Sequence, residues 1–363
     1  MREIRDDVAR WSRDNRRVAI ARVVAVDGSG PRDPGAAMAV AETGEVAGSV
    51  SGGCVESSVV VEAGDVLAGR HEPRVVSFGY SDDDAFAVGL TCGGTVHVFT
   101  EVVDEAHLEV LGAVGDEEPV ALGTAVAGPG ATGKLVLRGD GSDSGTLGDD
   151  GLDRVVTRDL GAILEAGGAT LRHYGTHGEA RDDTVQVFLE AFVPPARLVI
   201  LGAVDFTAAL ARAGKLLGYR VIVSDPREVF ATEQRFPMAD RVVVDWPDRL
   251  LASLEPPLGP RDAVCVLTHD AKFVVPAITA ALSSDVGYLG AMGSRRTHAQ
   301  RLARLREAGV TEEQLERLMA PIGLDLGART PEEVAVSICA EMIAVRTGSD
   351  ASFLRDTDGP IHT

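Results

Sequence analysis

Short apolar runs separated by turn signals dominate the first half of the chain. Runs rich in β-branched and aromatic residues predict strands at 18–26, 74–78, 94–103, 119–128, 133–139 and 183–193. Two more short strands are expected on either side of the Thr43-Gly44 turn, and the pattern from Cys54 to about Arg70 is typical of a helix. Residues 140–151 are polar and predict a turn region. This half is therefore expected to be α/β or α+β, with no fixed-period repeat.

From Val193 onward, strands and helices alternate regularly. Apolar runs predict strands, which cover 197–203, 219–225, 240–245, 262–270 and 286–293. Amphipathic segments predict helices between them, including 205–218 and 273–284. Because each return to a parallel strand needs a crossover, this order predicts a Rossmann-like, doubly wound parallel sheet.

Consecutive prolines in "VPPAR" mark the expected domain boundary, since proline neither continues a helix nor pairs inside a sheet. We therefore expect an N-terminal α/β domain at 1–195 and a Rossmann-like domain at 196–347. Residues 348–363 are expected to form a loose tail.

Composition narrows the classes of function. The 363 residues carry a formal charge of −20, which argues against general affinity for nucleic acid or anionic membranes. No run of about 18 apolar residues occurs, and the N-terminal stretch is charged where a signal peptide needs an apolar core. A cytoplasmic protein is expected. Its four scattered cysteines suggest neither a disulfide framework nor a structural zinc site.

Two of the cysteines lie beside glycine pairs. Gly52 and Gly53 precede Cys54 at a strand-to-helix junction, and Cys92 precedes Gly93 in "TCGG". Glycine allows a ligand to approach the backbone closely, and a helix N-terminus favours the reactive thiolate. Packing beside a tight turn is the alternative. Cys265, in an apolar strand, and Cys339, on a helix, are expected to be buried. Arg32 is a further candidate in the turn-rich segment "GSGPRDPGAAM".

The first strand-to-helix turn of the Rossmann-like unit departs from the dinucleotide-binding pattern. Gly202 supplies the tight turn, but Val204 replaces the glycine that lets the backbone approach a pyrophosphate. Asp225 stands where a ribose-binding acid is expected, although a turn or cap role is open. NAD(P) binding is thus possible in principle but disfavoured by Val204.

Other candidates follow later strands. Ligands of open α/β sheets bind outside the carboxyl ends of the strands, where "VLTHD" places His269 and Asp270. The next junction carries glycine, hydroxyl and paired guanidinium groups, a combination that favours an anion cradle: Gly293, Ser294, Arg295 and Arg296. The structural alternatives are an edge histidine and arginines that pair with surface carboxylates. "ARTPEEV" is a capping box that begins a helix at Pro331.

Several long motifs, in order from about residue 18 to 346, resemble the XdhC/CoxI family, the accessory proteins of xanthine and carbon monoxide dehydrogenases. They are "GSGPRDPGAAMAV", "GSVSGGCVE", "TCGG", "LGAVDFTAAL", "SDPREVFATEQRFPMAD", "VLTHDAKF", "GYLGAMGSRRTH" and "PIGLDLGARTPEEVAVSI". The resemblance implies an N-terminal XdhC/CoxI domain, a C-terminal Rossmann domain and a homo-oligomer, expected as a homodimer.

The resemblance also implies a function in molybdoenzyme maturation. The protein would bind molybdenum cofactor, protect it during sulfuration by a cysteine-desulfurase-type sulfur donor, and deliver it to an apo molybdenum hydroxylase. The family's cysteine motifs fall on Cys54 and Cys92, and its C-terminal ligand motifs on Gly202, Asp225, His269, Arg295 and Arg296. Cys54 or Cys92 would lie near the molybdenum or assist sulfur exchange. Val204 departs from the glycine usual in relatives.

Two other classes of function remain open from the residues. One is an NAD(P)-dependent oxidoreductase that uses His269 or a cysteine in catalysis. The other is a scaffold that docks a sulfurase and an apo-dehydrogenase, which explains the glycine motifs poorly.

Overall fold

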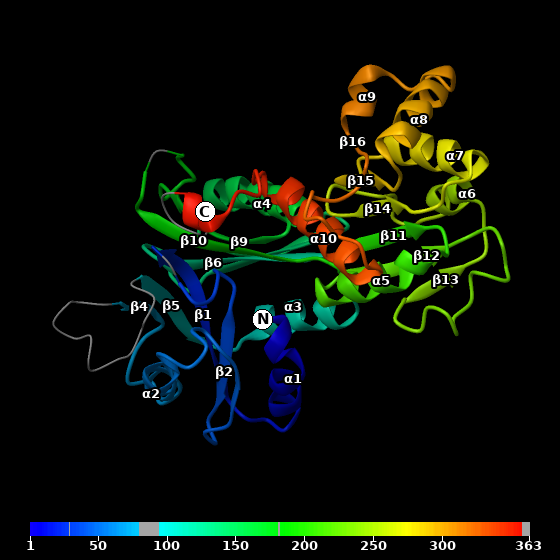
Figure 1. Cartoon of the computed structure of the whole chain (residues 1–363). Coiled ribbons are helices and arrows are strands. Elements are labelled where there is room, and N and C mark those ends of the chain that lie inside the picture. The colour runs from blue at the N-terminus through cyan, green and yellow to red at the C-terminus, as the bar shows by residue number, and fades with distance from the viewer. Residues whose placement is uncertain (29, 80–93, 181, 358–363) are drawn as a thin grey trace. The chain divides into compact units, whose positions relative to one another are not determined.

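The computed structural model describes residues 1–28, 30–79, 94–180 and 182–357. The chain divides into two compact units, one spanning Met1–Pro194 and the other beginning at Pro195 (Figure 1). Six apolar core clusters stabilise the fold, and each of them lies within a single unit.

The first unit begins with a short 3-10 turn, η1 (Arg2–Ile4), and helix α1 (Arg5–Arg13), and then forms an antiparallel sheet in the order β3-β2-β1-β5-β4. Its strands are β1 (Val18–Asp27), β2 (Ala37–Ala41), β3 (Val46–Gly48), β4 (Arg74–Phe78) and β5 (Thr95–Val102). Helix α2 (Glu56–Leu67) covers one face of this sheet, where Val59 and Ala63 pack on residues of β1 and β2.

Helix α3 (Glu105–Gly115) leads to a second antiparallel sheet, with the order β8-β7-β6-β10-β9. Its strands are β6 (Val120–Ala127), β7 (Lys134–Arg138), β8 (Asp143–Thr146), β9 (Gly168–Tyr174) and β10 (Val185–Phe192). Helix α4 (Asp150–Ala166) covers its outer face through Val156 and Leu160. The inner faces of the two sheets pack on each other.

The two sheets are copies of one arrangement. In each, three strands and a helix are followed by two strands, and the last strand pairs with the first. Register agrees as well: Arg22 faces Ala37 and Phe99, whereas Thr124 faces Lys134 and Phe188.

A β-bulge recurs at the same place, so that Val24 and Val126 are both skipped in the pairing. The bulge residues pack together with Phe99 and Phe188 between the sheets. The final strands also share sequence, "TVHVFTE" against "TVQVFLE". The first unit is therefore an internal structural repeat.

The second unit is the expected Rossmann fold. Six parallel strands lie in the order β13-β12-β11-β14-β15-β16, which is the 3-2-1-4-5-6 order of dinucleotide-binding folds. They are β11 (Arg197–Leu201), β12 (Arg220–Ser224), β13 (Arg241–Val243), β14 (Ala263–Val266), β15 (Tyr288–Ala291) and β16 (Leu318–Met319).

Helices cover both faces of this sheet (Figure 1). On one face lie α6 (Pro247–Ala252), α7 (Ala271–Leu282), α8 (Arg295–Glu307) and α9 (Glu312–Glu316). On the other lie α5 (Asp205–Leu216) and α10 (Pro331–Thr347). A short 3-10 turn, η2 (Leu354–Asp356), follows.

One expectation for the first unit needs correction, and two of its features were not predicted. Residues 143–146, expected as turn, form the edge strand β8, because pairing with β7 satisfies their backbone hydrogen-bonding groups. The segment is polar and contains glycine, so it has no apolar pattern that would predict a strand. Residues 150–166 form α4, whose start is capped by Asp149 rather than signalled by an apolar run. The absence of a fixed-period repeat concealed the duplication, because the loops of the two copies differ in length.

Candidate functional site

The carboxyl end of β15 opens into a cavity of about 630 Å³ in the Rossmann unit. Its walls are the start of α8 and the loop between β16 and α10. They are lined by Gly293, Ser294, Arg295, Arg296, Pro321, Ile322, Gly323, Leu324, Asp325, Leu326, Gly327, Ala328, Val334 and Ser337. The four residues predicted to form an anion cradle therefore lie in one cavity, together with Asp325.

Local sequence explains this junction. Gly293 has a φ of +151°, a backbone conformation that side chains disfavour, and a Cβ there would lie 3.1 Å from a nitrogen of Arg301. Ser294 then caps α8 by accepting a hydrogen bond from the Thr297 N–H at 3.1 Å. Arg295 and Arg296 follow in the first helical turn and are exposed. Both guanidinium groups thus stand where the helix dipole also favours an anion.

Arg301 lies behind Gly293 and was not singled out from the sequence. Its side chain is buried and donates to the Met292 carbonyl through Nη2, while Nη1 finds no hydrogen-bond partner within the described ranges. Burial lowers the pKa of Arg301, and among the described residues it has no carboxylate partner. Burial and Arg301 also lower the pKa of the neighbouring His298. A buried guanidinium without a counter-charge adds positive potential at this junction.

In the first βα turn of the Rossmann unit, neighbouring protein groups bind the carboxylate of Asp225, the residue expected to bind a ribose. Asp225, buried at the end of β12, accepts hydrogen bonds from the Ala203 N–H at 2.9 Å and from Arg227, whose Nε and Nη2 both lie at 2.8 Å. Burial alone would raise the pKa of Asp225, but these hydrogen bonds lower it. Gly202 has a φ of +118°, and a Cβ there would meet the Thr268 N at 2.7 Å. Close packing between the ends of β11 and β14 therefore requires glycine at position 202.

The remaining strand-end candidates lie outside the cavity lining. His269 is exposed after β14. Asp270 caps α7 by accepting from the Lys272 N–H at 3.1 Å. Their roles toward a ligand stay predictions. Cys265 and Cys339 are buried, as expected, and burial raises the pKa of each thiol.

In the first unit, Cys54 sits half-buried just before α2. Gly52 and Gly53 have φ values of +75° and +117°, and a Cβ on either would meet no described atom within 4 Å. The backbone beside Cys54 is thus open to approach. Cys92 and Gly93 lie outside the described residues.

Glu56 organises this loop. Its carboxylate accepts hydrogen bonds from the Ser49 and Ser51 hydroxyls and from the N–H groups of Ser51, Gly53 and Val55. Burial alone would raise the pKa of Glu56, but these hydrogen bonds lower it to about 2. The charged carboxylate therefore fixes the conformation of the glycine–cysteine loop.

Arg32 lies elsewhere in the first unit and makes an ion pair with Glu3, in which its Nη2 lies 2.8 Å from each carboxylate oxygen. It lines a different cavity, of about 340 Å³.

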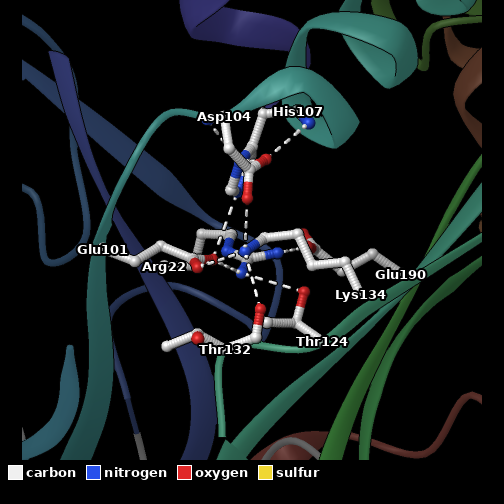
Figure 2. Close-up of polar contacts among 8 residues, drawn as sticks. All are labelled: Arg22, Glu101, Asp104, His107, Thr124, Thr132, Lys134 and Glu190. Carbon is white, nitrogen blue, oxygen red and sulfur yellow. Dashed lines mark hydrogen bonds and ion pairs between the residues drawn. The ribbon is translucent and has the colours of Figure 1, made fainter. Parts of the chain in front are cut away.

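Figure 2 shows a buried polar network between the two sheets that sequence reasoning missed. Arg22, fully buried on β1, donates to Glu101, Glu190 and Thr124. Lys134 also lies 2.7 Å from Glu101. Burial alone would raise the pKa of Glu101, but its partners hold it at about 2.

None of the described helices combines the length and the apolar character that crossing a membrane requires. The fold and the cavity define a class: a two-unit protein whose Rossmann unit carries an arginine-rich pocket at the carboxyl edge of its sheet. The model of the XdhC Rossmann domain matches residues 198–342, and that of the XdhC and CoxI family matches residues 11–79. Together these cover more than half of the chain, and the protein belongs to the XdhC and CoxI family.

Individual relatives resemble the chain over most of its length. A probable xanthine dehydrogenase subunit of Bacillus subtilis is 28% identical over 342 residues, which cover 92% of this chain and 94% of that protein. The molybdenum cofactor insertion chaperone PaoD of Escherichia coli is 27% identical over 326 residues, covering 89% and 82%. The crystal structure of a xanthine dehydrogenase from Bacillus halodurans shares the fold, with a TM-score of 0.69, 24% identity and 98% of both chains covered.

Proposed function

We propose that this protein is a maturation factor for a molybdenum hydroxylase. It binds molybdenum cofactor as cargo, protects it while its terminal sulfur is installed by a cysteine-desulfurase-type donor, and delivers it to the apo-enzyme. The similarity to the PaoD insertion chaperone supports this class of function. The observation that carries the binding site is the cavity at the start of α8, with its two exposed arginines and the buried Arg301 behind them.

Molybdenum cofactor is an anionic, phosphorylated pterin. A phosphate group suits the start of α8, because Arg295 and Arg296 can form charge-assisted hydrogen bonds with it and the helix dipole adds to the attraction. In a protein with a net charge of −20, such a local positive site is what an anionic cargo needs. Gly293 lines the same cavity, and the space that its Cβ would take is filled by Arg301 and Thr297.

The thiol of Cys54 is the candidate for contact with molybdenum or for sulfur exchange. Its support is the open backbone at Gly52 and Gly53 and the absence of a side-chain cap from the described residues at the start of α2. The repeat offers a comparison: Thr146 donates to Asp153 as Ser49 donates to Glu56, which makes Gly151 the counterpart of Cys54. Gly151 lies in the first turn of α4, and Asp149 caps that helix. Of these two described loops, the first thus combines an uncapped helix start with a thiol.

An oxidoreductase that uses NAD(P) in the ordinary Rossmann pose fits less well. Val204 stands where a pyrophosphate needs glycine, and both oxygens of Asp225 already bind Arg227. NAD(P)H therefore serves as the competing ligand in the test.

The test is equilibrium binding of intact molybdenum cofactor to the purified protein. It compares wild type with Arg295→Ala/Arg296→Ala and with Cys54→Ala. Arg304→Ala/Arg346→Ala is the matched control, because it removes two exposed arginines outside the cavity. Loss of two phosphate contacts is expected to weaken binding about a hundredfold or more, since hydrogen bonds to charged groups contribute about 1.5–3 kcal/mol each.

Tight binding that persists in the control and is lost in the cavity variant supports the proposal. Equal binding by the cavity variant would refute the phosphate site. No cofactor binding by wild type, together with stoichiometric NAD(P)H binding, would refute the carrier function and favour a redox enzyme. Unchanged cofactor retention and client activation by Cys54→Ala would remove the thiol from the proposal.

A further inference from the structure

The cavity beside Arg32 is a second concave site, formed entirely within the first unit. It measures about 340 Å³, which is within the range of small-ligand pockets. Its lining combines small and apolar residues with charged ones: Met1, Arg2, Glu3, Arg32, Asp33, Pro34, Gly35, Ala36, Ala37, Gly168, Ala169, Glu190, Ala191 and Phe192.

Glu190 is the unusual member of this lining. Its side chain is 2% exposed, and one carboxylate oxygen, Oε2, accepts from Arg22. The other, Oε1, is buried without a hydrogen-bond partner in the part of the chain that the structure describes. A Cβ built on Gly35 would lie 3.9 Å from Oε1 and 3.2 Å from the Cβ of Ala169. The open oxygen thus faces the small residues of the cavity wall, and a buried charged oxygen without a donor is costly.

The internal repeat shows what completes such a carboxylate. In the matching registers, Glu101 is the counterpart of Glu190, and Lys134 is the counterpart of Ala37. Lys134 places its ammonium 2.7 Å from Glu101, so that carboxylate has donors on both oxygens (Figure 2). On the other side Ala37 has no ammonium to offer, and a cavity lies there instead.

The backbone around the two positions also corresponds. The Lys134 ammonium donates to the Thr132 carbonyl at 3.1 Å. Thr132, with a φ of +75°, matches Gly35, with a φ of +94°, and each donates its N–H to equivalent residues of the first strand, Ala125 and Val23. The Gly35 carbonyl therefore occupies the place of a second acceptor for an ammonium group.

The lining holds three carboxylates, from Glu3, Asp33 and Glu190, and three cationic groups: the guanidinium groups of Arg2 and Arg32 and the α-ammonium of Met1. Arg32 is already held by Glu3, and Arg2 donates to the Val193 carbonyl. Glu190 attracts the Met1 α-ammonium, but among the described groups its Oε1 has no hydrogen-bond donor and stays open as an acceptor on the cavity side.

We propose that this cavity binds a primary ammonium group on an alkyl stem, with the ammonium on Glu190 in the place that Lys134 fills in the other copy. The stem lies against Ala37, Ala169 and Phe192. The chemistry is shared by a free alkylamine and by the lysine side chain of a partner. It requires no molybdenum cofactor and stands or falls independently of the proposed function.

The experiment measures binding of butylammonium chloride to the full chain by calorimetric titration and by the shift in Tm. Butanol is the neutral probe of the same shape, and Nα-acetyl-lysine methylamide represents a protein lysine. Wild type is expected to bind butylammonium and not butanol. Glu190→Gln, which removes the charge and keeps the shape, is expected to weaken binding about tenfold or more.

Ala37→Lys is the decisive variant, because it supplies the ammonium covalently. It is expected to abolish butylammonium binding and to raise the Tm, as a filled counterpart of the Lys134 site. Glu165→Gln, on the exposed surface of α4, is the matched control and is expected to bind like wild type. If Ala37→Lys does not fold, Glu190→Gln still decides the question.

Equal binding to wild type, Glu190→Gln and Ala37→Lys would overturn the proposal, and so would no butylammonium or lysine-derivative binding by wild type. Binding of butylammonium alone would support a free amine as the ligand. Tighter binding of the lysine derivative would support a lysine side chain from a partner protein.

Discussion

At the scale of single residues, carboxylates do most to hold the loops in place. Glu56 gathers five hydrogen-bond donors around the glycine–cysteine loop, and Asp225 closes the first Rossmann turn by binding Arg227 and Ala203. In both cases, a carboxylate next to a candidate ligand site holds the local backbone in place by accepting hydrogen bonds. The loop beside Cys54 therefore depends on the ionised state of Glu56.

Glu56→Gln is expected to lower the free energy of unfolding by about 1–3 kcal/mol at neutral pH, because donors lose a charged acceptor. The pKa of Glu56 is lowered from 4.5 to about 2 in the folded state. Its contribution is thus present above the unfolded-state pKa and is lost as the pH falls from about 4.5 toward 2.

The measurement is urea unfolding of wild type and variant at several pH values. The gap between them should narrow in acid. Glu165→Gln, an exposed carboxylate on α4, should track wild type throughout. A gap between Glu56→Gln and wild type that stays constant down to pH 2 would show that the charge of Glu56 does not stabilise the loop.

At the scale of elements, helix starts position the Rossmann cavity. Ser294 caps α8 on one side, and Thr330 caps α10 beyond the loop that forms the other wall. In α10 the capping box is complete: Thr330 Oγ1 accepts from the Glu333 N–H at 3.2 Å, and Glu333 accepts from the Thr330 N–H at 3.0 Å. The sequence pattern predicted this box, and the structure confirms it.

Thr330→Ala is expected to destabilise the Rossmann unit by about 1 kcal/mol, because the Glu333 N–H loses its side-chain acceptor. Thr347→Ala, at the other end of the same helix, should change stability by less than about 0.5 kcal/mol. Chemical denaturation followed by circular dichroism compares the two. Equal effects at both ends would contradict a specific capping contribution.

At the scale of the whole molecule, each unit has core clusters of its own. Four clusters lie within the first unit and two within the second. We propose that the units are independent folding domains joined at the Pro194-Pro195 pair. The duplicated sheets of the first unit, in contrast, share their inner cores and the Arg22 network.

Segments 1–194 and 195–357 are each expected to fold alone, and the full chain is expected to unfold in two calorimetric transitions that match theirs. Segment 1–117, which separates the two sheets, is the control. It should not fold, because it exposes the inner face around Ile20 and leaves Arg22 and Glu101 without their partners from the second sheet. A single transition with both longer segments unfolded would contradict independent domains.

The sequence by itself determined the Rossmann unit. Its buried parallel strands are continuous apolar runs, and its helices begin with local caps, so neighbouring residues carry both signals. The same holds for the cradle of Gly293, Ser294, Arg295 and Arg296, whose members are adjacent along the chain.

Only the tertiary structure decided the rest. Arg22 binds Glu101 and Glu190, which lie 79 and 168 positions away in the sequence. Arg301, in the second turn of α8, donates to the Met292 carbonyl just before that helix. The duplicated sheets appear through pairing register rather than through a repeated apolar pattern. The lack of a hydrogen-bond donor at Glu190 Oε1 is likewise a result of tertiary packing. Glu190 shares a face of β10 with Gln186 and Phe188, so the local pattern predicts neither its burial nor the partner it lacks; both depend on the opposite sheet.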